Sequence, residues 1–187
     1  NGAGRKLNSF TLSDGTNQLE VTNIQTSATD AVYKDKTSLV LTTNPGATLS
    51  FSAMDWTGSW MHAYVYIDYD GNKTFNTTAN NDGTTGGELV TYSAYRAESS
   101  GNRFKDINGN LTPDSDGSGN DSHEGDGGNG VSVSSIPSWT LPSDLDPGTY
   151  RLRFKIDWNS IDPCGGTTIK SNNGAMVDIT LEVEDST

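Results

Sequence analysis

The sequence predicts an all-β fold, a two-sheet antiparallel β-sandwich of the jelly-roll kind, formed as a single domain over residues 1–187. Three observations support this expectation. Short segments in which apolar and polar residues alternate recur along the chain, and alternation with a period of two is typical of strands. Clusters of Gly, Pro, Asn or Asp separate these segments, as turns require. Helical periodicity is nearly absent.

Nine segments have the composition of strands. In chain order they cover residues 8–13, 19–27, 37–43, 48–54, 61–68, 88–95, 131–136, 150–158 and 175–183. Short strands in this number, separated by turns, form a sandwich or jelly roll rather than an α/β fold. Residues 97–130 differ, because they contain almost no apolar side chain and are rich in Asp, Asn, Gly and Ser. We expect a long polar loop there, which is either functional or disordered.

The strands at 61–68 and 150–158 define the predicted core. Side chains of a strand alternate between its two faces, so every second residue points the same way. One face of each of these strands is apolar. The residues that we expect between the two sheets are Met61, Val65, Ile67, Leu152, Phe154 and Ile156.

The opposite faces of the same strands carry polar and aromatic residues. They are His62, Tyr64, Tyr66 and Asp68 in the first strand, and Arg151, Arg153, Lys155 and Asp157 in the second. If both strands belong to one sheet, the rings can stack on sugar faces and the guanidinium groups can donate hydrogen bonds to sugar oxygens. The alternative is an ordinary solvated sheet face with Tyr–Arg cross-strand pairs.

Two tryptophans extend this predicted surface. Trp56 and Trp60 flank a Thr-Gly-Ser sequence just before the strand at 61–68, and loops carry binding residues more often than strands do. Packing in the core or at a sheet edge is the alternative for each. The full set of predicted ligand-binding residues is Trp56, Trp60, His62, Tyr64, Tyr66, Arg151, Arg153 and Asp157.

Charge and composition exclude several classes of function. The formal net charge is −12, whereas proteins that bind nucleic acid normally show a basic surface. No apolar run is as long as the roughly 18 residues that a membrane-spanning helix needs. The charge suits an extracellular protein, and acidic loops suit calcium. The single cysteine, Cys164, excludes an internal disulfide, and we expect it to be a packed turn residue rather than a nucleophile.

The sequence DYDGN, which begins at Asp68, resembles the start of a calcium-binding loop. Asp68, Asp70 and Asn72 present oxygen atoms at alternate positions around a glycine. The spacing departs from that of an EF-hand, so a more distant acidic residue such as Glu88 would have to complete the shell. The alternative is a turn whose carboxylates cap backbone N–H groups. We predict calcium as a cofactor, with Asp68, Asp70 and Asn72 as ligands.

Three segments together resemble the GEVED-type β-sandwich domain of secreted bacterial proteins. They read YVYIDYDGNKTF at 64–75, LDPGTYRLRFKIDWNSIDPCGG at 145–166 and GAMVDITLEV at 174–183. The chain is also similar to accessory domains of bacterial glycan-degrading enzymes. Of the family's closing motif, only Gly174 and Asp178 are kept. The resemblance implies a noncatalytic module of a secreted or cell-surface protein, whose partners are glycans and other domains of the same parent protein.

Catalysis is the less favoured class of function. Asp68 and Asp157 would form a glycosidase pair only if they met about 5–9 Å apart, and both begin turns, where Asp commonly caps. No Gly-x-Ser-x-Gly elbow and no phosphate-binding P-loop occurs. We therefore expect no enzyme, and we predict the binding of glycans, acidic ones included. The alternative is a structural spacer or adhesion domain with no small ligand.

Overall fold

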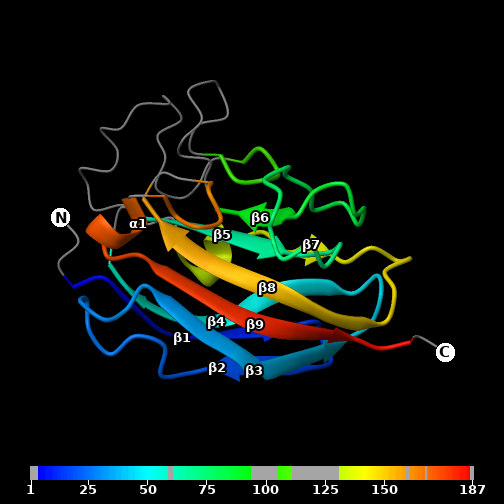
Figure 1. The fold of residues 1–187 in the computed structure, drawn as a ribbon, viewed down its shortest axis with the longest axis horizontal. Helices are drawn as coiled ribbons and strands as arrows, with labels where there is room; N and C mark the ends of the chain where they lie inside the picture. The colour runs from blue at the N-terminus through cyan, green and yellow to red at the C-terminus, as the bar shows by residue number, and fades with distance from the viewer. Residues whose placement is uncertain are drawn as a thin grey trace.

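The structure is a computed structural model that describes residues 4–58, 61–93, 105–110, 131–158, 161–166 and 168–185. Its strands form two sheets that pack against each other (Figure 1). The four-stranded sheet has the order β2-β1-β4-β7, with β1 (Lys6–Ser13), β2 (Gln18–Val21), β4 (Thr48–Thr57) and β7 (Trp139–Thr140). The five-stranded sheet has the order β3-β9-β8-β5-β6, with β3 (Tyr33–Thr43), β5 (His62–Ile67), β6 (Leu89–Tyr92), β8 (Gly148–Asp157) and β9 (Ala175–Val183).

In the described part of the chain, two short helical turns accompany the sheets. They are the 3-10 turn η2 (Val133–Ser135) and the single α-helical turn α1 (Thr168–Ser171). Within the ranges given above, no helix is long and apolar enough to span a membrane.

The predicted two-sheet sandwich is confirmed, with differences in single strands. The edge strand β3 runs parallel to β9, while the other named pairs are antiparallel. A parallel pair needs a long connection, and most of the chain separates these two strands. The predicted strand at 19–27 ends at Val21, whereas β3 begins four residues before the predicted start at residue 37.

The predicted strand at 131–136 is wrong, because this segment forms η2. The backbone N–H of Ser132 donates to Ser135 Oγ at 2.9 Å, and the N–H of Ser135 donates to the carbonyl of Ser132 at 3.2 Å. Serine side chains compete in this way with the ladder bonds of a sheet. Of the polar loop predicted at 97–130, only residues 105–110 are described, and the prediction for the remainder lies outside the described residues.

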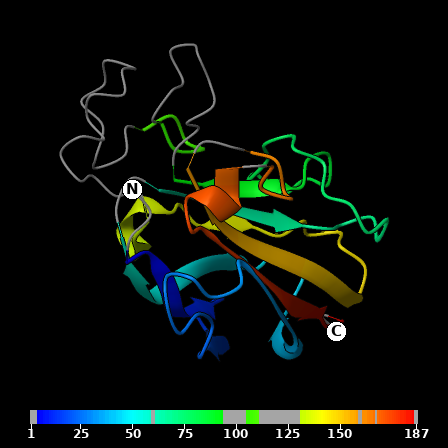
Figure 2. The ribbon, with the colours of Figure 1, turned by 60° about the vertical axis from the view of Figure 1, so that its left-hand side comes forward.

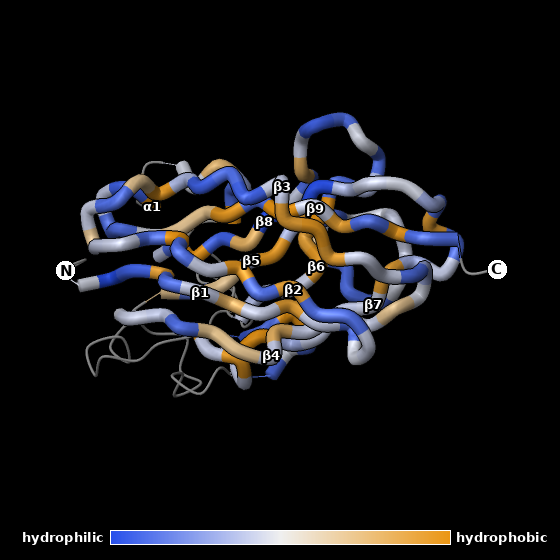
Figure 3. The backbone as a smooth tube through the Cα atoms, turned by 90° about the horizontal axis from the view of Figure 1, so that it is seen from below, coloured by the Kyte–Doolittle hydropathy of each residue, from blue (hydrophilic) through white to orange (hydrophobic). Residues whose placement is uncertain are grey.

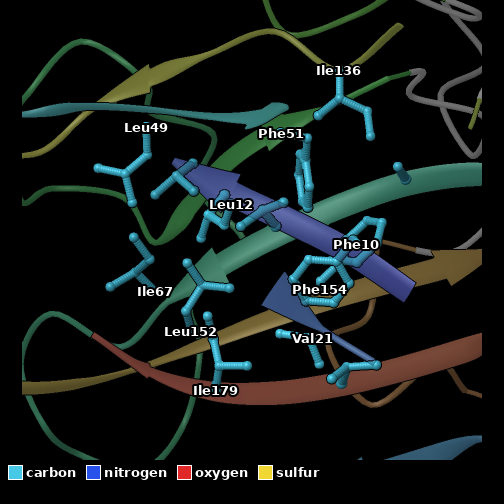
Figure 4. Packing of buried hydrophobic residues seen from close by; sticks show 14 of the residues in the cluster. Phe10, Leu12, Val21, Leu49, Phe51, Ile67, Ile136, Leu152, Phe154 and Ile179 are labelled. Carbon is cyan, nitrogen blue, oxygen red and sulfur yellow. The ribbon is translucent and has the colours of Figure 1, made fainter. Parts of the chain in front are cut away.

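The main core lies between the two sheets and contains three phenylalanines in mutual contact (Figure 4). The ring centroids of Phe10 and Phe51 are 5.6 Å apart, and Phe154 lies 5.2 Å from Phe10 and 4.7 Å from Phe51. The six predicted core residues all have 0% exposure, so that prediction is confirmed. Figure 3 shows apolar residues concentrated along the middle of the strands and polar residues in the connections at both ends.

The outer face of the five-stranded sheet is covered as well. Every residue of β5 is buried, although only alternate side chains can point into the main core. In Figures 1 and 2 the segments 69–88 (green) and 161–166 (orange) lie on the side of this sheet that faces away from the other sheet. Beneath them lies a second cluster of Tyr64, Tyr66 and Leu89, against which Phe75, Tyr92 and Ile161 pack.

Candidate functional site

The predicted aromatic surface on β5 is wrong, because Tyr64 and Tyr66 both have 0% exposure. The Tyr66 hydroxyl donates to the carbonyl oxygen of Ile161 at 2.5 Å, and its ring centroid lies 5.7 Å from that of Phe75. Burial raises the pKa of Tyr66 well above its ordinary value. These rings form a second small core beneath the loops rather than a platform for a ligand.

His62 and Asp157 lie opposite each other in the β5–β8 register and are also buried, with 4% and 0% exposure. Lys155 Nζ donates to Asp157 Oδ2 at 3.2 Å and to the carbonyl oxygen of Asp162 at 2.5 Å. Burial lowers the pKa of Lys155, and the charge of Asp157 opposes this shift. The prediction that His62 and Asp157 belong to an exposed ligand surface is therefore wrong.

Of the two predicted tryptophans, the one that the structure describes, Trp56, does not extend the sheet face. Trp56 belongs to β4 in the other sheet, opposite Leu7 of β1, and packs partly buried against the main core. Its indole Nε1 is buried and has no hydrogen-bond partner in the described part of the chain. Trp56 therefore packs at the margin of the main core rather than beside Tyr64 and Tyr66, and its ligand role stays a prediction. Trp60 lies outside the described residues.

Arg153 is held by a buried carboxylate of the neighbouring strand β9. Its Nε and Nη2 donate to the two carboxylate oxygens of Asp178 at 2.7 and 2.9 Å, and its Nη1 donates to the carbonyl of Pro163 at 2.9 Å. The guanidinium carbon also lies 5.0 Å from the Phe75 ring centroid. Such a bidentate pair fixes both groups, so Arg153 anchors the turn at Pro163 and has few donors left for a ligand.

Among the predicted ligand residues that the structure describes, Arg151 is the exposed one. Its side chain is 47% exposed, and its Nε lies 3.7 Å from Asp178 Oδ2, which already accepts from Arg153. Arg151 lines a pocket of about 600 Å³, which we call the Arg151 pocket. The other lining residues are Asp68, Lys73, Thr74, Phe75, Arg153, Pro163 and Cys164.

The loop after β5 forms one wall of the Arg151 pocket. Asp68 Oδ2 accepts the backbone N–H of Lys73 at 2.9 Å, and Asp70 Oδ1 accepts that of Asn72 at 3.0 Å. Gly71 and Lys73 both have a φ of 68°, which lets the chain reverse within a few residues. No described carboxylate forms an ion pair with Lys73, whose exposed side chain lines the pocket.

Cys164 also lines the Arg151 pocket and is exposed, so the expectation of a packed cysteine is wrong. Its backbone N–H donates to Asp162 Oδ1 at 2.8 Å. An Asp that accepts from the residue two positions later forms an Asx-turn, which is why the DPCGG sequence leaves its cysteine at a turned, solvent-facing position.

The two carboxylates weighed as a catalytic pair lie far apart. His62 pairs with Asp157 and Ile67 with Leu152, so Asp68 and Asp157 lie at opposite ends of the antiparallel β5–β8 pair. Six residues of strand span about 20 Å, which exceeds the roughly 5–9.5 Å between glycosidase carboxylates. The option that Asp68 and Asp157 act together is therefore wrong.

Of the predicted metal ligands, Asp68 and Asp70 lie together and Glu88 joins them. One carboxylate oxygen of each residue lies within 4.8 Å of the others. The β5–β6 pairing brings Glu88 close, since the Ile67 N–H donates to the Glu88 carbonyl at 3.0 Å. Asn72 Oδ1 instead accepts the N–H and hydroxyl of Thr74 at 2.8 and 2.7 Å, so these bonds occupy its oxygen.

Comparisons with known proteins add no relative: no protein-family model, curated protein or solved structure matches the chain. The resemblance to the GEVED-type domain stays a prediction. The two residues that carry its closing motif nevertheless have structural roles here. Asp178 is the bidentate partner of Arg153, and a Cβ added to Gly174 would lie 2.3 Å from the carbonyl oxygen of Ile156.

Proposed function

We propose that the chain is a noncatalytic module that binds glycans carrying acidic groups in the Arg151 pocket. The observation that carries this proposal is the exposed guanidinium of Arg151 beside Lys73 and Phe75, in a chain whose net charge is −12. A guanidinium fork matches a carboxylate in geometry, and an ammonium adds a second cationic donor. The Phe75 ring provides an apolar surface for a sugar face.

The size and lining of the Arg151 pocket support a small saccharide. Its volume of about 600 Å³ falls within the roughly 300–1,000 Å³ of ligand-binding pockets. An acidic substituent of a sugar can accept hydrogen bonds from Arg151 and Lys73, which both line the pocket. The contacts would be shallow and wet, so we expect a Kd between about 10 μM and 1 mM.

The arrangement of carboxylates supports binding without catalysis. Among its described lining residues, the Arg151 pocket has a single carboxylate, Asp68. Glycoside hydrolysis needs a pair of them flanking the scissile bond. The acidic charge and the resemblance to accessory domains support a secreted or cell-surface bacterial protein in which other domains carry the chemistry.

A structural spacer or adhesion domain is the second candidate function. The observation that favours it is the burial of β5 on both faces, because a sheet covered on both sides forms a stiff body without an open platform. Both candidates share the same fold, so only a binding measurement separates them.

The test is a binding assay on the full chain with oligosaccharides matched in length, with and without uronic acid or sulfate groups. We expect the acidic members to bind and the neutral ones to bind at least tenfold more weakly. Arg151→Ala and Lys73→Ala should each weaken binding about tenfold or more, since a hydrogen bond to a charged group contributes about 1.5–3 kcal/mol. Lys36→Ala, which makes the same charge change on β3, is the matched control.

The assay also decides between the two candidates. If no oligosaccharide binds the wild-type chain, the spacer function is the better account. If binding is unaffected in both pocket variants, or falls equally in the Lys36 variant, the Arg151 pocket is not where the glycan binds.

A further inference from the structure

Three carboxylates converge where the loop after β5 meets β6. Asp68, Asp70 and Glu88 each direct an oxygen to a region in which these atoms lie within 4.8 Å of one another. Asp68 and Glu88 are buried, with 7% and 1% exposure. No described lysine or arginine forms an ion pair with any of the three carboxylates. The cluster therefore has a formal charge of about −3 that no described cationic side chain neutralises.

Backbone hydrogen bonds account for part of this cluster. Glu88 accepts the N–H of Tyr69 at 2.7 Å and that of Asn76 at 2.8 Å, one on each carboxylate oxygen. Backbone N–H groups carry no net charge, so these two bonds do not neutralise the carboxylates. Capping of the turn therefore leaves the mutual repulsion of the carboxylates in place.

One oxygen of the cluster is left without any partner. Asp68 Oδ2 accepts the N–H of Lys73, but Asp68 Oδ1 is buried and has no hydrogen-bond partner among the described residues. A buried acceptor without a partner costs about 1–3 kcal/mol, and more when it is charged. Such an atom in a native structure points to a bound ion or water.

The solvent side of the cluster is acidic too. Asp70 and Glu88 line a pocket of about 330 Å³ together with Asp144 and Asp146 from the turn before β8. None of the described residues that line this pocket is basic. A cation in this pocket would thus lie among four carboxylates, two of which belong to the cluster.

We propose that Asp68, Asp70 and Glu88 bind a calcium ion that fixes the loop after β5 to the start of β6. Calcium binds oxygen atoms at about 2.3–2.6 Å, so ligands on opposite sides of the ion are up to about 5 Å apart, as in this cluster. The remaining ligands would come from water and from oxygens of the acidic pocket. This site shares Asp68 with the Arg151 pocket, but the argument for calcium does not rest on the proposed glycan binding.

The experiment measures calcium binding and thermal unfolding of the full chain after treatment with chelator, with the metal alone and no sugar present. With a Kd near 10 μM, 1 mM calcium should raise the melting temperature by about 5–10 °C. The same concentration of magnesium should give a smaller rise, because magnesium releases its water less readily.

Two variants and one control test the ligand assignment. Asp70→Asn and Glu88→Gln should each weaken calcium binding at least tenfold, read by calorimetry on the folded variants. Asp55→Asn makes the same charge change on β4 and should bind calcium like the wild type. Asp70 is exposed, so its variant keeps the test decisive if Glu88→Gln folds poorly.

Several outcomes would overturn the assignment. Absence of both a calcium-dependent shift and a heat of binding would leave the carboxylates as caps of the turn. Calcium binding that persists in both variants, or is lost equally in the Asp55 variant, would place the effect elsewhere. An equal rise in melting temperature with magnesium would contradict the assignment of the ion as calcium.

Discussion

Replacement of Lys155 by methionine tests whether the second core beneath the loops depends on a buried ion pair. Lys155 has 0% exposure, and its Nζ lies 3.2 Å from Asp157 Oδ2 and 4.7 Å from the centroid of the Tyr64 ring. Methionine fills a similar volume but leaves the Asp157 carboxylate without its cation. Removal of one partner of a buried pair costs about 3–5 kcal/mol.

The assay is thermal or urea unfolding of Lys155→Met beside wild type. For a chain of this size, the loss corresponds to a fall in melting temperature of about 6–20 °C. The double variant Lys155→Met with Asp157→Asn should recover most of the lost stability. The neutral amide removes the buried charge, and its oxygen can still accept from the Trp158 N–H. If Lys155→Met is as stable as wild type, or if the double variant is no more stable than the single one, the ion pair does not act as argued.

Three further predictions concern stability. Val65→Asp should unfold the chain, since an unpaired charge in the main core costs several kcal/mol, and a soluble variant that melts normally would contradict the core. Gly174→Ala should lower the free energy of unfolding by about 1–3 kcal/mol, because its Cβ would lie 2.3 Å from the Ile156 carbonyl oxygen. Gly86→Ala is the control and should change stability little, because nothing lies within 4 Å of its Cβ. Equal denaturation midpoints for the two variants would refute this prediction. Burial lowers the pKa of Lys155 below 10.5, so between the lowered pKa and pH 10.5 the unfolded chain binds more protons than the folded one. The stability of wild type relative to Lys155→Met should therefore rise as the pH rises through this window. A difference in unfolding free energy that does not change with pH would contradict this prediction.

The sequence predicts the strands that form the main core, with the exception of β7. Alternation placed Met61, Val65 and Ile67 on one face, and these residues are fully buried. The same alternation does not show what lies over the other face of a strand. Tyr64 and Tyr66 were therefore expected at the surface, although the segment at 69–88 and Ile161 cover them.

The candidate sites depended on contacts between residues far apart in the chain. Asp178 lies 25 residues beyond Arg153, and only the β8–β9 register places their side chains together. Glu88 reaches Asp68 and Asp70 only because β6 pairs with β5. The capping turn, which was the alternative to a calcium loop, depends only on residues close in the chain. Asp68 accepts the backbone N–H of Lys73, and Asp70 accepts that of Asn72.

The two proposed sites share the segment at 69–88, and its composition explains why. Its apolar side chains are Tyr69, Phe75 and Ala79, so hydrophobic burial offsets little of the entropy lost when this segment is ordered. Hydrogen bonds to Asp68 and Glu88 hold its backbone at Lys73, Tyr69 and Asn76. These bonds place the carboxylates of Asp68 and Glu88 close together, so the same hydrogen bonds that order the segment also hold like charges near each other. A cation at this point would relieve that repulsion and hold Lys73 and Phe75 at the wall of the Arg151 pocket.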